Sequence, residues 1–185
     1  MARETSTSAA SSASGPVAAE GRPIFLVGFM GSGKTTLAAA LAAAIGWERV
    51  DTDEEVERIE GRTIERIIRE AGESRFREAE RRVLSALDGR RRCVVATGGG
   101  LFLGAAARRW MKVRGRTIWI DVPLEECARR VGSGRGRPLW TAGRDPLGFR
   151  ALYERRRAAY ALADLRLPAG SGTAAEDVRR LVALL

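Results

Sequence analysis

The segment that most constrains this chain is a glycine-rich run, residues 28–35. It consists of Gly-Phe-Met-Gly-Ser-Gly-Lys-Thr and matches the phosphate-loop pattern of a glycine, four free positions and Gly-Lys-Ser/Thr. The apolar residues 24–27 predict a buried strand before it, and the Ala/Leu-rich residues 36–45 predict a helix after it. This context favours a nucleotide-binding α/β domain over the alternative, an ordinary glycine-rich turn.

The residue types of the loop suit a polyphosphate. Glycines let successive backbone N–H groups face inward, and the following helix adds partial positive charge at its start. Lys34 can reach the β- and γ-phosphates, and the Thr35 hydroxyl can bind the Mg²⁺ that accompanies ATP. The predicted ATP contacts in this segment are Gly31, Ser32, Gly33, Lys34, Thr35 and Thr36.

Length and composition predict one α/β domain at residues 21–185, preceded by a tail. Residues 1–20 are rich in Ala and Ser without an apolar core, which favours disorder over a signal sequence. No apolar run approaches 18 residues, so we expect no membrane span. Cys93 and Cys127 are predicted to be buried thiols. We expect a cytoplasmic protein and, without an evident exposed apolar stripe, a monomer.

The chain has no histidine, so catalysis is left to carboxylates and to cations that bind phosphate. Phosphoryl transfer tolerates this, because it depends on positioning and electrostatics. The net charge of +9 and pI of about 10.9 raise nucleic-acid binding as an option. The basic excess is nearly all arginine and also suits anionic small ligands, so we expect no specific nucleic-acid partner. A basic nucleic-acid-binding ATPase remains an alternative.

Apolar runs and breakers predict strands alternating with helices. The further strands are expected at residues 47–51, 92–97, 117–121 and 165–168, and the further helices at 54–60, 63–70, 73–87, 105–114, after Pro123, at 147–162 and from Thr173. Such alternation implies a parallel sheet with right-handed crossovers. Residues 132–146 hold four glycines, two prolines and three arginines, which predicts a mobile loop.

An acidic pair follows the second predicted strand. Asp51 and Asp53 should lie near the phosphate loop, since ligands of parallel α/β sheets bind outside the carboxyl ends of the strands. A carboxylate there can accept a hydrogen bond from a substrate hydroxyl and orient it or take its proton. The alternative is that the pair only caps a helix.

Four further segments, together with the phosphate loop, resemble the shikimate kinase family. They are Asp51-Thr52-Asp53, residues 72–80 (Gly-Glu-Ser-Arg-Phe-Arg-Glu-Ala-Glu), Gly98-Gly99-Gly100 and Arg137-Pro138-Leu139, in order within residues 23–160. The resemblance implies a three-layer α/β/α P-loop kinase fold with a five-stranded parallel sheet, a helical substrate-binding segment at 52–81 and a mobile lid at 131–146. It also implies transfer of the ATP γ-phosphoryl group to the 3-hydroxyl of shikimate, in chorismate biosynthesis.

The resemblance assigns roles to single residues on the acceptor side. It implies that Asp53 binds the reacting hydroxyl and that Arg77 and Arg156 bind the shikimate carboxylate. Residues Gly98, Gly99 and Gly100 would let the backbone approach the substrate ring. For Arg77 the alternative is a solvated ion-pair face, because glutamates lie four residues before it and three after it. Because Arg155 and Arg157 flank Arg156, the arginine that corresponds to the family residue could lie one position earlier or later.

On the nucleotide side, the resemblance implies that Asp51 holds Mg²⁺ through water beside Thr35. Arg130 would stack on adenine, and Arg137 would swing over the phosphates as the lid closes. Solvated surface is the alternative for both arginines. Asp121, at the end of an apolar strand, resembles the Asp that assists Mg²⁺ binding in other phosphate-loop enzymes; the resemblance to the shikimate kinase family favours a structural role instead.

Three positions depart from the family pattern. Ile68 stands where a Phe is frequent, Trp140 where a Leu is usual, and residues 168–172 replace a more polar adenine loop. A kinase of another hydroxy acid, such as gluconate, and a degenerate ATP-binding regulator therefore remain alternatives.

Overall fold

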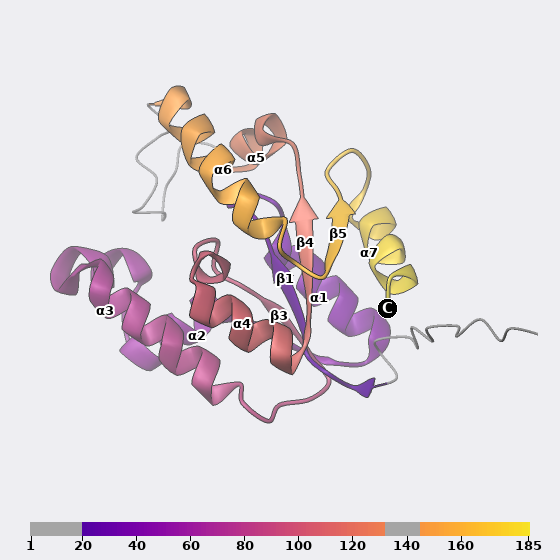
Figure 1. The fold of residues 1–185 in the computed structure, drawn as a ribbon, viewed down its shortest axis with the longest axis horizontal. Coiled ribbons are helices and arrows are strands. Elements are labelled where there is room, and N and C mark those ends of the chain that lie inside the picture. Colours follow the sequence, from indigo (N-terminus) through magenta and orange to yellow (C-terminus); the bar gives the residue numbers. More distant parts are fainter. Residues whose placement is uncertain (1–19, 132–144) are drawn as a thin grey trace, which may run out of the picture.

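The computed structural model describes residues 20–131 and 145–185. Its centre is a five-stranded parallel sheet with strand order β2-β3-β1-β4-β5 (Figure 1). The strands are β1 (Ile24–Val27), β2 (Glu48–Asp51), β3 (Cys93–Ala96), β4 (Arg116–Asp121) and β5 (Leu165–Pro168). β1 and β3 are buried along their whole length, as expected for central strands of a parallel sheet covered on both faces.

Helices cover both faces of the sheet, which confirms the predicted three-layer fold. They are α1 (Lys34–Ile45), α2 (Thr52–Glu60), α3 (Ile64–Ala86), α4 (Ala105–Arg114), α5 (Leu124–Val131), α6 (Pro146–Tyr160) and α7 (Ala174–Ala183), with a 3₁₀ helix η2 (Leu101–Leu103) before α4. In Figure 1, α4 and α6 lie in front of the sheet and α1 lies behind it. No helix in the described ranges is long and apolar enough to cross a membrane.

Two helix starts differ from the sequence prediction. α1 begins at Lys34, directly after Gly33 in a left-handed conformation, rather than at residue 36. α2 begins at Thr52 rather than at residue 54, because the Asp51 side chain accepts a hydrogen bond from the Asp53 N–H at 3.0 Å and caps the helix. Asp53 therefore lies in the first helical turn and not at the end of the strand.

The two helices predicted around residue 72 form one element, α3. Thr63 caps its start as predicted, by accepting a hydrogen bond from the Arg66 N–H. Gly72 breaks the helical conformation at φ 81° and ψ 167°, so the predicted interruption is present as a kink. The 3₁₀ helix η2 was not predicted; it follows the glycine turn at residues 98–100.

The apolar residues form two separate cores. The main core surrounds the sheet and contains both cysteines, which are buried as predicted. Burial raises the pKa of each thiol to about 11. A small core lies between α2 and α3, and its buried members are Val56, Ile67, Phe76, Ala79 and Val83. The segment predicted to bind the acceptor thus has a core of its own.

Candidate active site

The phosphate loop connects β1 to α1. Gly31 has φ +79°, and a Cβ there would lie 2.6 Å from the Cys127 carbonyl oxygen, so both conformation and space require glycine. The Lys34 ammonium donates to the Phe29 carbonyl oxygen at 2.8 Å, and its side chain is buried. The loop is thereby held between the sheet and α5, with its cation at the start of α1.

Thr35 and Asp51 meet beside the loop although they belong to different elements. The Thr35 hydroxyl donates to Asp51 Oδ2 at 2.8 Å, while Asp51 Oδ1 caps α2. Asp51 is therefore a helix cap, as the alternative held, and also a neighbour of Thr35. A hydroxyl and a carboxylate are hard oxygen ligands that suit Mg²⁺, which is bound by few protein groups and by the phosphates of its nucleotide.

Asp53 lies against the glycine turn at residues 98–100. A Cβ built on Gly98 would lie 2.4 Å from Asp53 Oδ1 and 3.4 Å from Glu80 Oε1. The Gly98 N–H donates to the Thr52 hydroxyl at 2.8 Å, which ties the turn to α2. Only glycine at position 98 lets the backbone approach this carboxylate.

Arg77 is held between two glutamates on α3. Its guanidinium donates to Glu73 at 2.7 Å and to Glu80 at 2.7 Å, and a Cβ on Gly100 would lie 2.7 Å from its Nη1. The sequence spacing of these ion pairs also allowed the alternative that Arg77 lies on a solvated helix face. Glu80, however, is only 2% exposed. Arg77 therefore lies over the glycine turn and not on an open helix face.

Glu80 also belongs to the site. Its spacing in the sequence predicted that it pairs with Arg77 but not that it is buried. Its Oε1 is buried and has no hydrogen-bond partner among the described residues. Burial raises the pKa of Glu80, and the hydrogen bond from Arg77 partly offsets this shift. No local pattern marks its burial, because it depends on the packing of α3 against the glycine turn.

Arg156 on α6 completes this side. It is half-buried, whereas Arg155 and Arg157 are exposed. Its Nη1 lies 3.7 Å from a Cβ built on Gly99, and its guanidinium lies 5.9 Å from the centre of the Phe29 ring. Packing thus selects Arg156 from the three neighbouring arginines as the one that faces the glycine turn.

Tyr160 anchors the same turn and was not predicted. Its hydroxyl donates to the Gly99 carbonyl oxygen at 2.5 Å, and burial raises its pKa to about 12. The two residues are far apart in the sequence, so only the fold brings them together. The neutral phenol fixes the turn relative to α6.

A cavity lies beside the phosphate loop and the start of α1. It has a volume of about 250 Å³, and its lining residues are Ser32, Gly33, Thr36, Leu37, Arg130, Gly172, Ala174 and Asp177. The predicted nucleotide contacts Thr36 and Arg130 therefore face the same space as part of segment 168–172. Arg130 is held by Glu126 at 2.6 Å. Sequence analysis missed Asp177, a buried carboxylate in the first turn of α7.

The remaining predicted residues lie elsewhere. Asp121 accepts a hydrogen bond from Arg166 Nε at 2.8 Å, a pairing that fits its structural interpretation. Ile68 packs against the small core between α2 and α3. Arg137 and Trp140, and most of the predicted lid, lie outside the described residues, as do residues 1–19 of the predicted tail.

A phosphate loop next to a glycine turn that is surrounded by one carboxylate and two arginines defines a P-loop kinase for a small molecule. The family model described as shikimate kinase matches residues 30–185. A shikimate kinase of Persephonella marina is 44% identical over 146 residues, 79% of this chain and 88% of that protein. A shikimate kinase of Synechococcus elongatus is 43% identical over 150 residues, 81% of this chain and 78% of that protein.

The same family is found among solved structures. The shikimate kinase from Acinetobacter baumannii in complex with shikimate has a TM-score of 0.85 and 34% sequence identity, over 91% of this chain and 96% of that one. The chain therefore belongs to the shikimate kinase family and is an ATP-dependent kinase. The resemblance in the sequence motifs is confirmed.

Proposed function

We propose that this chain transfers the γ-phosphoryl group of ATP to the 3-hydroxyl of shikimate. The observation that carries the proposal is the glycine turn at residues 98–100, which has Asp53 against its first residue, Arg156 near its second and Arg77 over its third. A carboxylate and two guanidiniums around a surface without side chains suit a compact acceptor with hydroxyls and a carboxylate. The relative from Acinetobacter baumannii, solved with shikimate, supports this acceptor.

On the acceptor side, Arg77 and Arg156 hold the carboxylate of shikimate. A guanidinium pairs with a carboxylate through two parallel hydrogen bonds, which fixes orientation as well as position. Glu73 and Glu80 keep Arg77 in place by ion pairs at 2.7 Å. Asp53 accepts the hydrogen bond of the 3-hydroxyl and orients it or takes its proton. The oxygen of this hydroxyl then bonds to the γ-phosphorus as the bond from phosphorus to the β,γ-bridging oxygen breaks.

On the donor side, the phosphate loop and Lys34 bind the β- and γ-phosphates. Mg²⁺ bound with ATP supplies positive charge to the phosphate oxygens, and Thr35 and Asp51 are the residues that would hold it. Arg130 lines the cavity beside the loop and is the proposed adenine contact. Arg137 remains the predicted arginine that covers the phosphates, and it lies outside the described residues.

A coupled assay of ADP release tests the proposal. The enzyme receives Mg-ATP with shikimate, quinate, gluconate or no acceptor. We expect turnover with shikimate at about 1 s⁻¹ or faster, the usual range for enzymes. ADP release with gluconate alone would leave the kinase fold intact but overturn the roles of Arg77 and Arg156. ATP binding without turnover on any acceptor would favour a degenerate regulator.

Three further expectations accompany the proposed function. The chain is expected to act as a monomer in the cytoplasm and without a specific nucleic-acid partner. Binding of RNA or DNA that weakens steeply with salt would contradict the last of these. Light scattering at assay concentration tests the monomer.

A further inference from the structure

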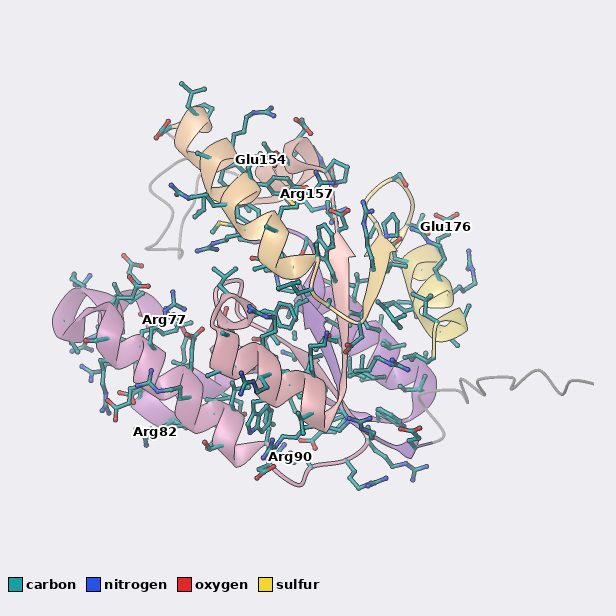
Figure 2. The ribbon with its side chains drawn as sticks, viewed as in Figure 1. Arg77, Arg82, Arg90, Glu154, Arg157 and Glu176 are labelled. Carbon is teal, nitrogen blue, oxygen red and sulfur yellow. The ribbon has the colours of Figure 1, made fainter. Side chains whose placement is uncertain are left out.

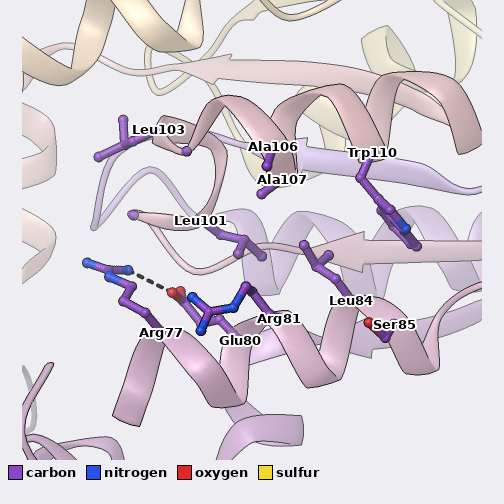
Figure 3. A pocket seen from close by; sticks show the side chains of 12 residues that line it. Arg77, Glu80, Arg81, Leu84, Ser85, Leu101, Leu103, Ala106, Ala107 and Trp110 are labelled. Atoms are coloured by element: carbon purple, nitrogen blue, oxygen red, sulfur yellow. Dashed lines mark hydrogen bonds and ion pairs between the residues drawn. The ribbon is translucent and has the colours of Figure 1, made fainter. Parts of the chain in front are cut away.

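A cavity of about 650 Å³ lies between α3 and the segment that runs from η2 into α4 (Figure 3). Its lining residues are Arg77, Glu80, Arg81, Leu84, Ser85, Gly100, Leu101, Leu103, Gly104, Ala106, Ala107 and Trp110. It shares Arg77, Glu80 and Gly100 with the acceptor site, but Asp53 and Arg156 do not line it. The cavity therefore begins at Arg77 and extends along α3 toward Trp110, and neither Asp53 nor Arg156 lines it.

The two ends of this cavity differ in chemistry. Leu84, Leu101, Ala107 and Trp110 give one end apolar walls, as Figure 3 shows. At the other end, the charge of Arg77 is matched by two glutamates, whereas Arg81 has no hydrogen bond or ion pair with any described residue. An unmatched guanidinium thus stands at the rim of an apolar pocket.

We infer that this cavity is a binding site for a small aromatic carboxylate, with its ring between Leu84, Ala107 and Trp110 and its carboxylate on Arg81. The volume lies within the usual range of roughly 300–1,000 Å³ for small-molecule sites, which are mostly apolar with a few polar groups. Arg81 and Leu84 are three residues apart on α3 and both line the cavity, so one ligand can contact both. A short flexible chain between the ring and the carboxylate lets the carboxylate reach the Arg81 guanidinium, which Figure 3 shows on the Arg77 side of the cavity.

Arg77 couples this cavity to the acceptor site, a step that rests on the proposed function. Its Nη1 donates to Glu80 Oε2 at 2.7 Å, and both side chains line the cavity (Figure 3). A ligand that shifts this pair changes the guanidinium offered to shikimate. Because linkage is reciprocal, the ligand weakens shikimate binding by the same factor by which shikimate weakens the ligand.

The test uses 3-phenylpropionate as probe, the neutral 3-phenylpropionamide as its control, and ligand-observed NMR on the full chain without ATP. We expect saturable binding of the acid and at least threefold weaker binding of the amide. Arg81→Gln should weaken the acid roughly three- to tenfold, since an exposed arginine is partly screened. Ala107→Phe fills the apolar end and should abolish binding. Arg109→Gln on the exposed side of α4 and Ala105→Phe outside the cavity are the matched controls and should bind as the wild type does.

A kinetic measurement completes the test. Saturating 3-phenylpropionate should raise the KM for shikimate at least twofold in the wild type and leave it unchanged in Ala107→Phe, whose basal kcat is retained. Absence of saturable binding of 3-phenylpropionate to the wild type would overturn the inference. Equal binding to Ala107→Phe and to the wild type would also overturn it, because the probe would then occupy the acceptor site and not this cavity. Arg81→Gln changes only a surface charge and keeps the inference testable if Ala107→Phe does not fold. The NMR measurement of probe binding does not require turnover. It therefore tests this cavity even if shikimate proves not to be the acceptor.

Discussion

The nucleotide side and the acceptor side of this active site are built by different means. The phosphate loop is set between β1 and α1 within the main core, and the residues of β1 are fully buried. The acceptor side stands on α2 and α3, which have their own small core, and its arginine is positioned by ion pairs. In the proposed site, backbone geometry therefore holds the phosphates, whereas ion pairs between side chains position the arginine that binds the acceptor. Charge changes on α3 should therefore separate the two substrates kinetically.

The largest effect is expected at the carboxylate that joins the two sides. Asp53→Asn removes the carboxylate that we propose orients or deprotonates the hydroxyl, and it should lower kcat about 10²- to 10⁴-fold. ATP binding should change little, because the phosphate loop is untouched. Glu54→Gln, the exposed neighbour on α2, is the matched control and should keep wild-type kcat. A kcat for Asp53→Asn within threefold of the wild type would refute its role.

Arg77→Ala should affect the acceptor side alone. Loss of a half-buried charge pair with the substrate should raise the KM for shikimate roughly 30- to 300-fold, with the KM for ATP nearly unchanged. Arg82→Ala, on the same helix in Figure 2 and paired with Glu60 at 3.2 Å, controls for the loss of an arginine from α3. Equal loss of affinity for both substrates would indicate a folding defect and remove the contrast between the two sides.

Glu80→Gln should have a smaller kinetic effect and a diagnostic pH dependence. Arg77 loses one charged partner, so the KM for shikimate should rise roughly three- to tenfold. Burial raises the pKa of Glu80 above its ordinary value of 4.5, so the folded state holds this proton more tightly than the unfolded state does. The wild type should therefore lose stability relative to Glu80→Gln as the pH rises from 4.5 toward the folded pKa. Urea unfolding at pH 4, 5, 6 and 7 measures this, and a difference in stability that does not vary with pH would contradict it.

The smallest selective effect is expected from the small core. Ile67→Ala and Ile118→Ala both truncate fully buried isoleucines, one in each core, and should each cost about 2–5 kcal/mol of stability. Because Ile67 supports α3, its variant should raise the KM for shikimate two- to fourfold more than the KM for ATP. Steady-state kinetics at 20 °C measure the two constants. Parallel changes of both constants in Ile67→Ala would show that the cores do not act separately.

Local patterns in the sequence were sufficient for the parts of the site that depend on neighbouring residues. The phosphate loop, the cap at Thr63 and the kink at Gly72 are each determined within a few positions, and each was predicted. The two missed helix starts, at Lys34 and Thr52, are also local but lie within the usual error of helix boundaries.

Contacts between distant segments could not be predicted in this way. The hydrogen bond from Tyr160 to Gly99 and the choice of Arg156 over its neighbours depend on how α6 packs on the sheet. The burial of Glu80 depends in the same way on α3 and the glycine turn. The pattern of apolar residues in one helix does not show which residues of another element will contact that helix.

The proposed site directs the phosphoryl group to one particular hydroxyl of shikimate, the one on C3. The most direct measurement is a ³¹P–¹H correlation NMR spectrum of the product formed from Mg-ATP and shikimate. The proposed site predicts a phosphorus coupled to the proton on C3 and to no other ring proton. Phosphorus coupled to the proton on C4 or C5, or no shikimate-dependent product, would contradict the proposed site.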